Sequence, residues 1–280
     1  MRVLVTGGTG LLGKEAVAAL YSHTVLAPRR ADLDVANADQ TIDFVRASVP
    51  DVVIHCAAMA RVDECEQNPE AAFRINAEGG ANLATACRGA KCHLIAVSTD
   101  YVFDGEKGAP YHEFDAVNPI NVYGRSKLEA ERAIQRILPD AAIVRTAWLF
   151  GLGPCFAARA IQMAQEGQRM RFVDDKWGSP TYTVDLANQI AKIAENRLRG
   201  VFHIVNDGRA TWKEVAEQAF KSMGLTHTVV GISKSDWPTP AERPTDTSLV
   251  SYRSGWNGLP PMRPWQDAMD DWASIFYQAG

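Results

Sequence analysis

The sequence predicts an α/β fold in which a doubly wound parallel sheet is joined to a smaller α/β lobe. Three observations support this prediction. Short apolar runs alternate with amphipathic stretches at the spacing of βαβ units. A glycine-rich turn follows the first of these runs. After residue 150 the alternation becomes less regular, and proline, tryptophan and arginine become more frequent.

The first predicted strand, residues 2–6, runs directly into a glycine-rich turn at residues 7–13, and a helix is expected from about residue 11 to residue 21. The glycines fit G-x-G-x-x-G when counted from Gly8 and G-x-x-G-x-x-G when counted from Gly7. Glycine allows a sharp turn and lets backbone N–H groups approach a pyrophosphate. The turn therefore predicts a Rossmann-type dinucleotide site, with a merely structural turn as the alternative.

The second predicted strand, residues 24–27, is followed by Arg29 and Arg30. At this position an acid binds the 2′-hydroxyl of NAD, whereas an arginine accommodates the 2′-phosphate of NADP. NADPH is therefore the expected cofactor, although the nearby Asp32 keeps NADH open. Arginines exposed without a ligand are the alternative. Asp34 and Val35 follow in a segment suited to line the adenine pocket.

Further apolar runs at residues 51–58, 93–98 and 141–146 complete the predicted sheet. Residues 1–150 are expected to form an NAD(P)-binding Rossmann domain, rejoined by a helix and a strand at about 183–206. Residues 151–182 and 207–280 are expected to form a substrate-binding lobe. Within it, Thr211 and Glu214 have the spacing of a capping box, and the proline-rich segment 226–264 is expected to form loops over the substrate.

Composition indicates a soluble enzyme. The chain has 280 residues, of which 46% are hydrophobic and 22% charged, enough for one sizeable core and a smaller lobe. The net charge of −4 argues against a nucleic-acid partner. We expect no membrane segment, no signal peptide and a cytoplasmic location. Neither the acids nor the cysteines show metal-ligand spacing, so no metal is expected, and reduced thiols are expected at Cys56, Cys65, Cys87, Cys92 and Cys155.

A second motif carries chemistry. Tyr123 precedes Lys127 by four residues at the start of a predicted helix. Side chains at this spacing lie on one helix face, so the ammonium is expected to favour the phenolate and lower the tyrosine pKa. Such a tyrosine can protonate a carbonyl oxygen near neutral pH. Alone, the pair is more often two residues sharing a helix surface, but the nucleotide-binding signature in the same chain favours a catalytic role.

Five blocks occur in order along the chain: residues 98–105 (STDYVFDG), 118–127 (NPINVYGRSK), 145–151 (RTAWLFG), 178–181 (GSPT) with 185–187 (DLA), and 243–244 (RP). In these blocks the chain resembles the extended short-chain dehydrogenases and, within them, the dTDP-4-dehydrorhamnose reductase family. The resemblance spans nearly the whole chain.

The resemblance implies a catalytic triad of Thr99, Tyr123 and Lys127. Thr99 would hydrogen-bond the substrate carbonyl. Tyr123 would protonate its oxygen as hydride arrives from the nicotinamide, and Lys127 would anchor the nicotinamide ribose and tune the tyrosine.

Binding residues follow from the motifs and the resemblance together. For Trp148 and Val35, packing in the core is the alternative. The substrate-binding residues are expected to be Thr99, Asp100, Trp148 and Arg243. The cofactor-binding residues are expected to be Gly7, Gly10, Leu11, Leu12, Gly13, Arg29, Arg30, Asp34, Val35, Ala57, Ala58, Met59, Tyr123 and Lys127.

The implied reaction is the NAD(P)H-dependent reduction of a nucleotide-linked 4-keto-6-deoxy sugar, dTDP-4-dehydrorhamnose, to dTDP-L-rhamnose. Its diphosphate needs cationic partners, for which Arg169, Lys176, Arg243 and Arg253 are candidates. The chain departs from the family pattern at several positions: His55-Cys56 and Met59-Ala60 after the third strand, Lys176 in place of glutamine, and Val250 in place of aspartate. The reaction class is therefore a firmer expectation than the sugar.

Two other functions stay open at this point. One is an NAD-dependent nucleotide-sugar epimerase or dehydratase of the same superfamily, against which Arg29 and Arg30 argue. The other is a non-catalytic NADP-binding regulatory subunit similar to the β subunit of methionine adenosyltransferase. The expected partner is a nucleotide sugar, and the sequence leaves a homodimer open.

Overall fold

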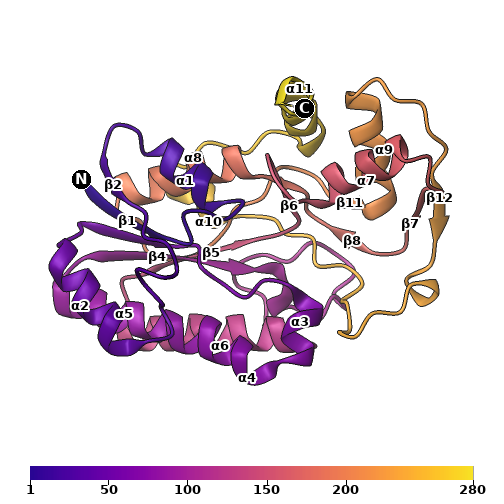
Figure 1. Cartoon of the computed structure of the whole chain (residues 1–280). Coiled ribbons are helices and arrows are strands. Elements are labelled where there is room, and N and C mark those ends of the chain that lie inside the picture. Colours follow the sequence, from indigo (N-terminus) through magenta and orange to yellow (C-terminus); the bar gives the residue numbers. More distant parts are fainter. Residues whose placement is uncertain (280) are drawn as a thin grey trace.

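A six-stranded parallel sheet forms the centre of the molecule, shown as a computed structural model in Figure 1. The structure describes residues 1–279, with the side chains of residues 1–276. In spatial order the strands are β10 (Gly200–His203), β5 (Ala142–Thr146), β4 (His93–Thr99), β3 (Val52–His55), β1 (Arg2–Thr6) and β2 (Thr24–Leu26). The order reverses beside β1, which is where parallel sheets bind ligands at their carboxyl ends. The predicted fold class is confirmed.

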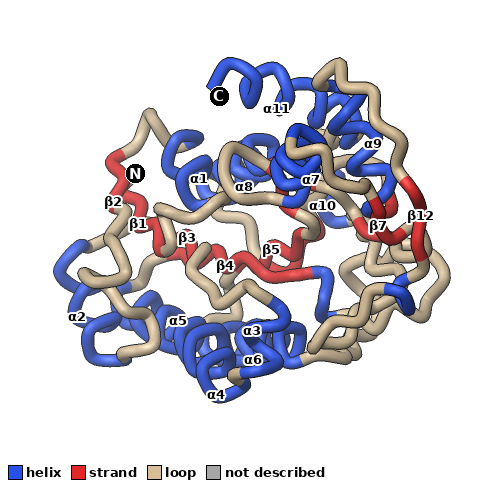
Figure 2. The backbone as a smooth tube through the Cα atoms, turned by 45° about the vertical axis from the view of Figure 1, so that its right-hand side comes forward, coloured by secondary structure: helices blue, strands red, loops and turns tan. Residues whose placement is uncertain are grey.

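Helices cover both faces of this sheet (Figure 2). On one face, α1 (Gly13–Ala19) and α8 (Thr183–Glu195) pack against Val3 and Val5 of β1. The opposite face, to which Leu4 points, carries α2 (Ala38–Ser48), α5 (Gly79–Ala90) and α6 (Val122–Ile137). Because successive strand residues point to opposite faces and both faces are covered, β1 is apolar without alternation.

Short helical segments connect these elements. Before α5 the chain forms α3 (Val62–Gln67), α4 (Pro69–Ala72) and the π-helical segment η1 (Phe73–Glu78). The 3₁₀ turn η2 (Asp100–Val102) follows β4, and α10 (Arg253–Trp256) lies beside β10. The segments from α3 to η1 and the turn η2 bring residues from distant parts of the sequence to the carboxyl ends of the strands.

The remaining elements surround a second hydrophobic core that includes Phe150, Ile161, Phe220 and Trp272. Three helices contribute to it, α7 (Phe156–Gln165), α9 (Trp212–Ser222) and α11 (Trp265–Ala279). Three two-stranded ribbons pair β6 (Leu149–Phe150) with β9 (Thr181–Tyr182), β7 (Arg171–Val173) with β12 (Val230–Ile232), and β8 (Trp177–Gly178) with β11 (Ala210–Thr211); the 3₁₀ turn η3 (Lys234–Asp236) follows β12.

Most differences from the sequence prediction lie at element ends. The first helix begins at Gly13 because the preceding residues form a turn closed by a 2.9 Å hydrogen bond from Gly10 N to Gly7 O. The predicted capping box is confirmed, since Thr211 N donates to Glu214 Oε2 at 2.7 Å and Glu214 N donates to Thr211 Oγ1 at 3.2 Å. No helix within residues 1–279 combines the length and apolar character needed to cross a membrane.

Candidate active site

The glycine turn after β1 is a tightly packed backbone cradle. Gly7 has φ +71°, and a Cβ atom there would lie 2.6 Å from the backbone nitrogen of Ala57, in the loop after β3. A Cβ atom on Gly13 would overlap the carbonyl oxygen of Gly7. A Cβ atom on Gly8 would lie 2.8 Å from the Cβ atom of Ala27. Close backbone packing therefore requires glycine at positions 7 and 13, whereas Gly8 is restricted by the side chain of Ala27.

The segment after β2 presents Arg29 and Arg30 at the surface. Asp32 accepts a hydrogen bond from Arg29 N at 3.2 Å, so its carboxylate faces the turn. Asp34 accepts from Ala36 N at 3.1 Å. The side chain of Val35 is buried in the core between the sheet and the helices α2 and α5. Its carbonyl oxygen accepts a hydrogen bond from Asn82 Nδ2 at 2.9 Å. Core packing thus accounts for the Val35 side chain.

The loop after β3 carries Ala57, Ala58 and Met59, and Asn76 of η1 holds it in place. Asn76 Oδ1 accepts from Met59 N at 2.8 Å, and its Nδ2 donates to Met59 O at 3.1 Å and to Ser126 Oγ at 2.9 Å. Sequence reasoning missed Asn76. Its only sequence signal is an amide in an otherwise amphipathic stretch, because its partners lie 17 and 50 residues away.

The three residues of the expected triad meet at the carboxyl end of β4. Thr99 ends that strand, and α6 supplies Tyr123 and Lys127. The helix begins after Asn121, whose Oδ1 accepts from Gly124 N at 2.8 Å. Gly124 lies against the carbonyl of Tyr101, where a Cβ atom would overlap the oxygen. This close approach sets the first turn of α6 beside Thr99.

The protonation of Tyr123 and Lys127 differs from the sequence expectation. Burial raises the pKa of Tyr123, a hydrogen bond with Thr99 opposes that rise, and Asp100 adds to it. Lys127 Nζ donates to the carbonyl of Val97 at 2.7 Å. The predicted lowering of the tyrosine pKa is therefore wrong for this structure, because the spacing places the lysine on the right face but its ammonium points to the strand.

Lys127 is itself buried, and desolvation lowers its pKa to about 8, while Glu131 and Cys56 oppose the change. Glu131 lies one turn further along α6 and is buried with Arg145. Its Oε2 accepts from Arg145 Nη2 at 2.6 Å, its Oε1 accepts from Arg145 Nε at 3.0 Å, and Ser98 Oγ also donates to Oε1. This network behind the lysine was not predicted.

Asp100 lies beside the triad and is buried. Its Oδ1 accepts from Thr99 Oγ1 at 3.0 Å, and Thr247 donates to its Oδ2. Burial raises the pKa of Asp100 to about 6, against the opposing effects of Thr247, Thr99 and Lys176. The carboxylate thus connects a triad residue to the second lobe.

Trp148 is half-buried and stacks on Trp212, with ring centroids 3.7 Å apart and an interplanar angle of 7°. Its backbone is left-handed, with φ +42°. Gly178 lies directly against the indole, where a Cβ atom would overlap it. The Nε1 atom of Trp148 is buried and has no partner among the described residues.

The four cationic candidates for the diphosphate separate in space. Arg243 pairs with Asp63 at 2.9 Å, and Lys176 Nζ donates to Tyr101 Oη at 2.9 Å. Arg253 instead lies against Gly200, the first residue of β10. It is therefore near the amino ends of the strands, whereas the triad is at their carboxyl ends. Arg169 is exposed ahead of β7. Of the four candidates, Arg243 and Lys176 therefore lie on the side of the triad.

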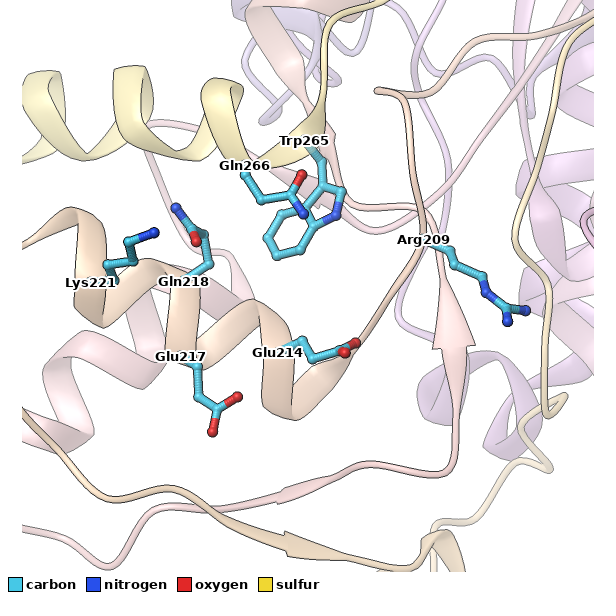
Figure 3. Close-up of a pocket in the computed structure, with 7 residues that line it drawn as sticks. All are labelled: Arg209, Glu214, Glu217, Gln218, Lys221, Trp265 and Gln266. Carbon is cyan, nitrogen blue, oxygen red and sulfur yellow. The ribbon is translucent and has the colours of Figure 1, made fainter.

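A cavity of about 280 Å³ lies elsewhere, between α9 and the start of α11 (Figure 3). It contains none of the predicted site residues, and its walls mix acids, amides and a lysine with Trp265. The lining residues are Arg209, Glu214, Glu217, Gln218, Lys221, Trp265 and Gln266.

Comparison with known proteins agrees with this geometry. A family model described as RmlD substrate binding domain matches residues 1–277. The chain is 39% identical over 277 residues to a dTDP-4-dehydrorhamnose reductase of Mycolicibacterium smegmatis, covering 96% of this chain and 84% of that protein.

Two solved structures have the same fold throughout. A dTDP-4-dehydrorhamnose reductase of Clostridium acetobutylicum superposes with a TM-score of 0.97 at 35% identity, covering 99% of this chain and 100% of the other. The enzyme of the same name from Bacillus anthracis, solved in complex with NADP, gives a TM-score of 0.94 at 32% identity, covering 97% and 98%. This chain therefore belongs to the dTDP-4-dehydrorhamnose reductase family.

Proposed function

We propose that this protein uses NADPH to reduce the 4-keto group of dTDP-4-dehydrorhamnose, giving dTDP-L-rhamnose. The observation that carries the proposal is the meeting of Thr99, Tyr123 and Lys127 at the carboxyl end of β4, close to the glycine cradle after β1. Membership of the family and the shared fold with an NADP complex support the same reaction.

The residues around the cradle fit a dinucleotide. Gly7 and Gly13 leave no room for side chains, so the turn keeps the close backbone packing that a pyrophosphate-binding turn requires. Arg29 and Arg30 are exposed beside β2 and suit a 2′-phosphate. The full set proposed to bind the cofactor is Gly7, Gly10, Leu11, Leu12, Gly13, Arg29, Arg30, Asp34, Val35, Ala57, Ala58, Met59, Tyr123 and Lys127.

When bound, the cofactor supplies the hydride that adds to the carbonyl carbon. The Thr99 hydroxyl, which donates to Asp100 in the structure, would turn to donate to the carbonyl oxygen. Tyr123 donates its phenolic proton to that oxygen, so the ketone becomes an alcohol. The raised pKa of Tyr123 keeps the phenol protonated before the reaction. Solvent then returns a proton to the phenolate, and Lys127, whose ammonium donates to the Val97 carbonyl, would anchor the nicotinamide ribose.

The substrate is proposed to lie between the sheet and the second lobe. Thr99 and Asp100 contact the sugar from β4 and η2, Trp148 packs against it, and Arg243 meets the diphosphate. In this arrangement residues 1–150 with 183–206 bind the cofactor, and residues 151–182 with 207–280 bind the substrate. A cytoplasmic location and a homodimer belong to the same proposal, and the homodimer is tested by sedimentation.

The direct test is oxidation of NADPH, with NADH in parallel, on adding enzymatically generated dTDP-4-dehydrorhamnose to the wild type and to Tyr123→Phe. We expect the variant to lose about 100- to 10,000-fold in kcat, because it lacks the proton donor, and to lose far less in its affinity for NADPH, because the other proposed cofactor-binding residues are unchanged. Tight NADPH binding without turnover in the wild type would overturn the proposal and favour a regulatory NADP-binding subunit.

A further inference from the structure

Lys176 is a buried lysine close to the triad. It lies in the turn between β7 and β8 and is 4% exposed. Its ammonium donates to Tyr101 Oη at 2.9 Å and lies 5.1 Å from the Tyr101 ring centroid and 6.0 Å from that of Trp148. Tyr101 in turn packs edge-to-face on Tyr123, with ring centroids 6.0 Å apart. One aromatic ring therefore separates this ammonium from the proton donor.

The hydrogen-bonding capacity of Lys176 is mostly unused. An ammonium has three N–H donors, and in the described part of the chain Nζ makes one hydrogen bond. Asp100 attracts it electrostatically, yet the ammonium and the carboxylate are more than 4.0 Å apart and form no ion pair. Burying a charge with so few partners is costly, and ligand oxygens would supply the missing acceptors.

The charges around Lys176 indicate which kind of oxygen it meets. It faces Asp100 of η2 and Asp63 of α3, and also Arg243 and Lys234 from the segment after β12. Arg243 is already paired with Asp63 at 2.9 Å. A phosphate placed between Lys176 and the Asp100 carboxylate would be repelled by that carboxylate, whereas a hydroxyl group can donate to Asp100 and accept from Lys176.

We propose that Lys176 and Asp100 together bind hydroxyl groups of the hexose next to the reacting carbonyl, and that Lys176 is a specificity-determining residue of this enzyme. The inference rests on the proposed function. A site built to hydrogen-bond a hydroxyl rejects analogues that lack it, because its buried polar groups are then left unpaired. A glutamine at this position would donate without a charge, so the ammonium sets the strength of this contact.

The test is calorimetric binding of dTDP-L-rhamnose and of dTDP to the NADP⁺-loaded protein, with Lys176→Met, Lys176→Gln and the wild type. We expect Lys176→Met to weaken dTDP-L-rhamnose binding by about 10- to 100-fold, the worth of a hydrogen bond to a charged group, and to leave dTDP binding unchanged. Lys176→Gln keeps one donor and loses less. Lys221→Met, an exposed lysine of α9, is the matched control.

A pH series gives a readout that a purely structural role would not move. Burial lowers the pKa of Lys176 to about 7. The wild type therefore loses the ammonium as pH rises through 7, and its advantage over Lys176→Met should shrink between pH 6 and pH 8.5.

Equal weakening of dTDP and dTDP-L-rhamnose would overturn the inference in favour of a diphosphate contact. No change in either affinity would overturn it in favour of packing alone. A wild type that neither binds dTDP-L-rhamnose nor reduces the keto sugar would instead refute the proposed function, so the two failures are distinguishable.

Discussion

At the scale of single residues, Gly13 has no room for a side chain. A Cβ atom there would overlap the Gly7 carbonyl oxygen, which also accepts the 2.9 Å hydrogen bond from Gly10 N. Any larger residue must move the backbone of the glycine turn, which we propose binds the cofactor. The absence of a Cβ atom at residue 13 therefore matters for local packing and, in this proposal, for cofactor binding.

We expect Gly13→Ala to weaken NADPH binding by at least about tenfold and to destabilise the fold by about 1–3 kcal/mol, since the added methyl group strains a packed turn. NADPH fluorescence titration and urea unfolding measure the two effects. Gly89→Ala is the control, because a Cβ atom at Gly89 in α5 meets nothing within 4 Å, and helix propensity favours alanine there. Equal behaviour of the two variants would contradict the packing argument.

Tyr123 and Lys127 show what a spacing can and cannot predict. Four residues of separation place both side chains on one face of α6, and the structure keeps them there. The pKa of each depends on burial and on groups far away in the sequence, namely Thr99 and Asp100 for the tyrosine and Cys56 for the lysine. The spacing alone therefore could not predict whether the pKa of Tyr123 is raised or lowered.

At the scale of elements, α6 carries Tyr123, Lys127 and Glu131 at successive intervals of four residues. The first acts at the substrate in our proposal, the second lies behind it, and the third is locked to Arg145 of β5. Glu131 opposes the desolvation that lowers the pKa of Lys127. The ion pair thus joins α6 to the sheet and supports the charge of the lysine.

We expect Glu131→Gln to move the alkaline limb of the kcat/KM profile to lower pH by on the order of one unit. Lys127 in the wild type has a pKa of about 8. Removing the neighbouring negative charge lowers it further, so the ammonium is lost at a lower pH, whereas the raised pKa of Tyr123 keeps the phenol protonated. An unmoved limb would show that Lys127 does not control this part of the profile.

The same variant leaves the buried guanidinium of Arg145 without its carboxylate, so we expect a loss of about 3–5 kcal/mol in the free energy of unfolding. Chemical denaturation measures it. Glu129→Gln, on the same helix, is the control for both experiments, and we expect it to change stability by less than about 0.5 kcal/mol.

Sequence patterns predicted the elements of the sheet but not the contacts between elements. Strand runs, the glycine turn and the capping box are local, so composition and spacing suffice for them. The Asn76 bonds to the loop after β3, the pairing of Glu131 with Arg145 and the contact of Lys176 with Tyr101 join residues 14 to 75 positions apart. Such contacts depend on the assembled fold, and no periodicity encodes them.

At the scale of the whole molecule, the cofactor proposed here contacts the ends of three strands at once, through the cradle after β1, the arginines after β2 and the loop after β3. A ligand that binds only the folded state raises stability with its concentration. Cofactor preference should therefore appear in the stability of the entire chain.

We expect NADPH at 100 times its dissociation constant to raise the free energy of unfolding by about 2.7 kcal/mol, and NADH at the same concentration to raise it less. The difference should vanish in Arg29→Ala/Arg30→Ala, because both guanidinium groups are lost while the glycine cradle stays intact. Thermal unfolding with each cofactor measures it. If the variant still prefers NADPH, Arg29 and Arg30 do not belong to the proposed cofactor site.

The indole of Trp148 contacts the bare backbone of Gly178 and stacks on the ring of Trp212. The three positions are at least 30 residues apart in the sequence. A side chain at residue 178 would clash with the indole, and a smaller residue at 148 or 212 would leave a void. In the evolution of this family the three should therefore be inherited as a set: lineages that keep the indole keep the glycine, and those that lose it free residue 178 to take a side chain.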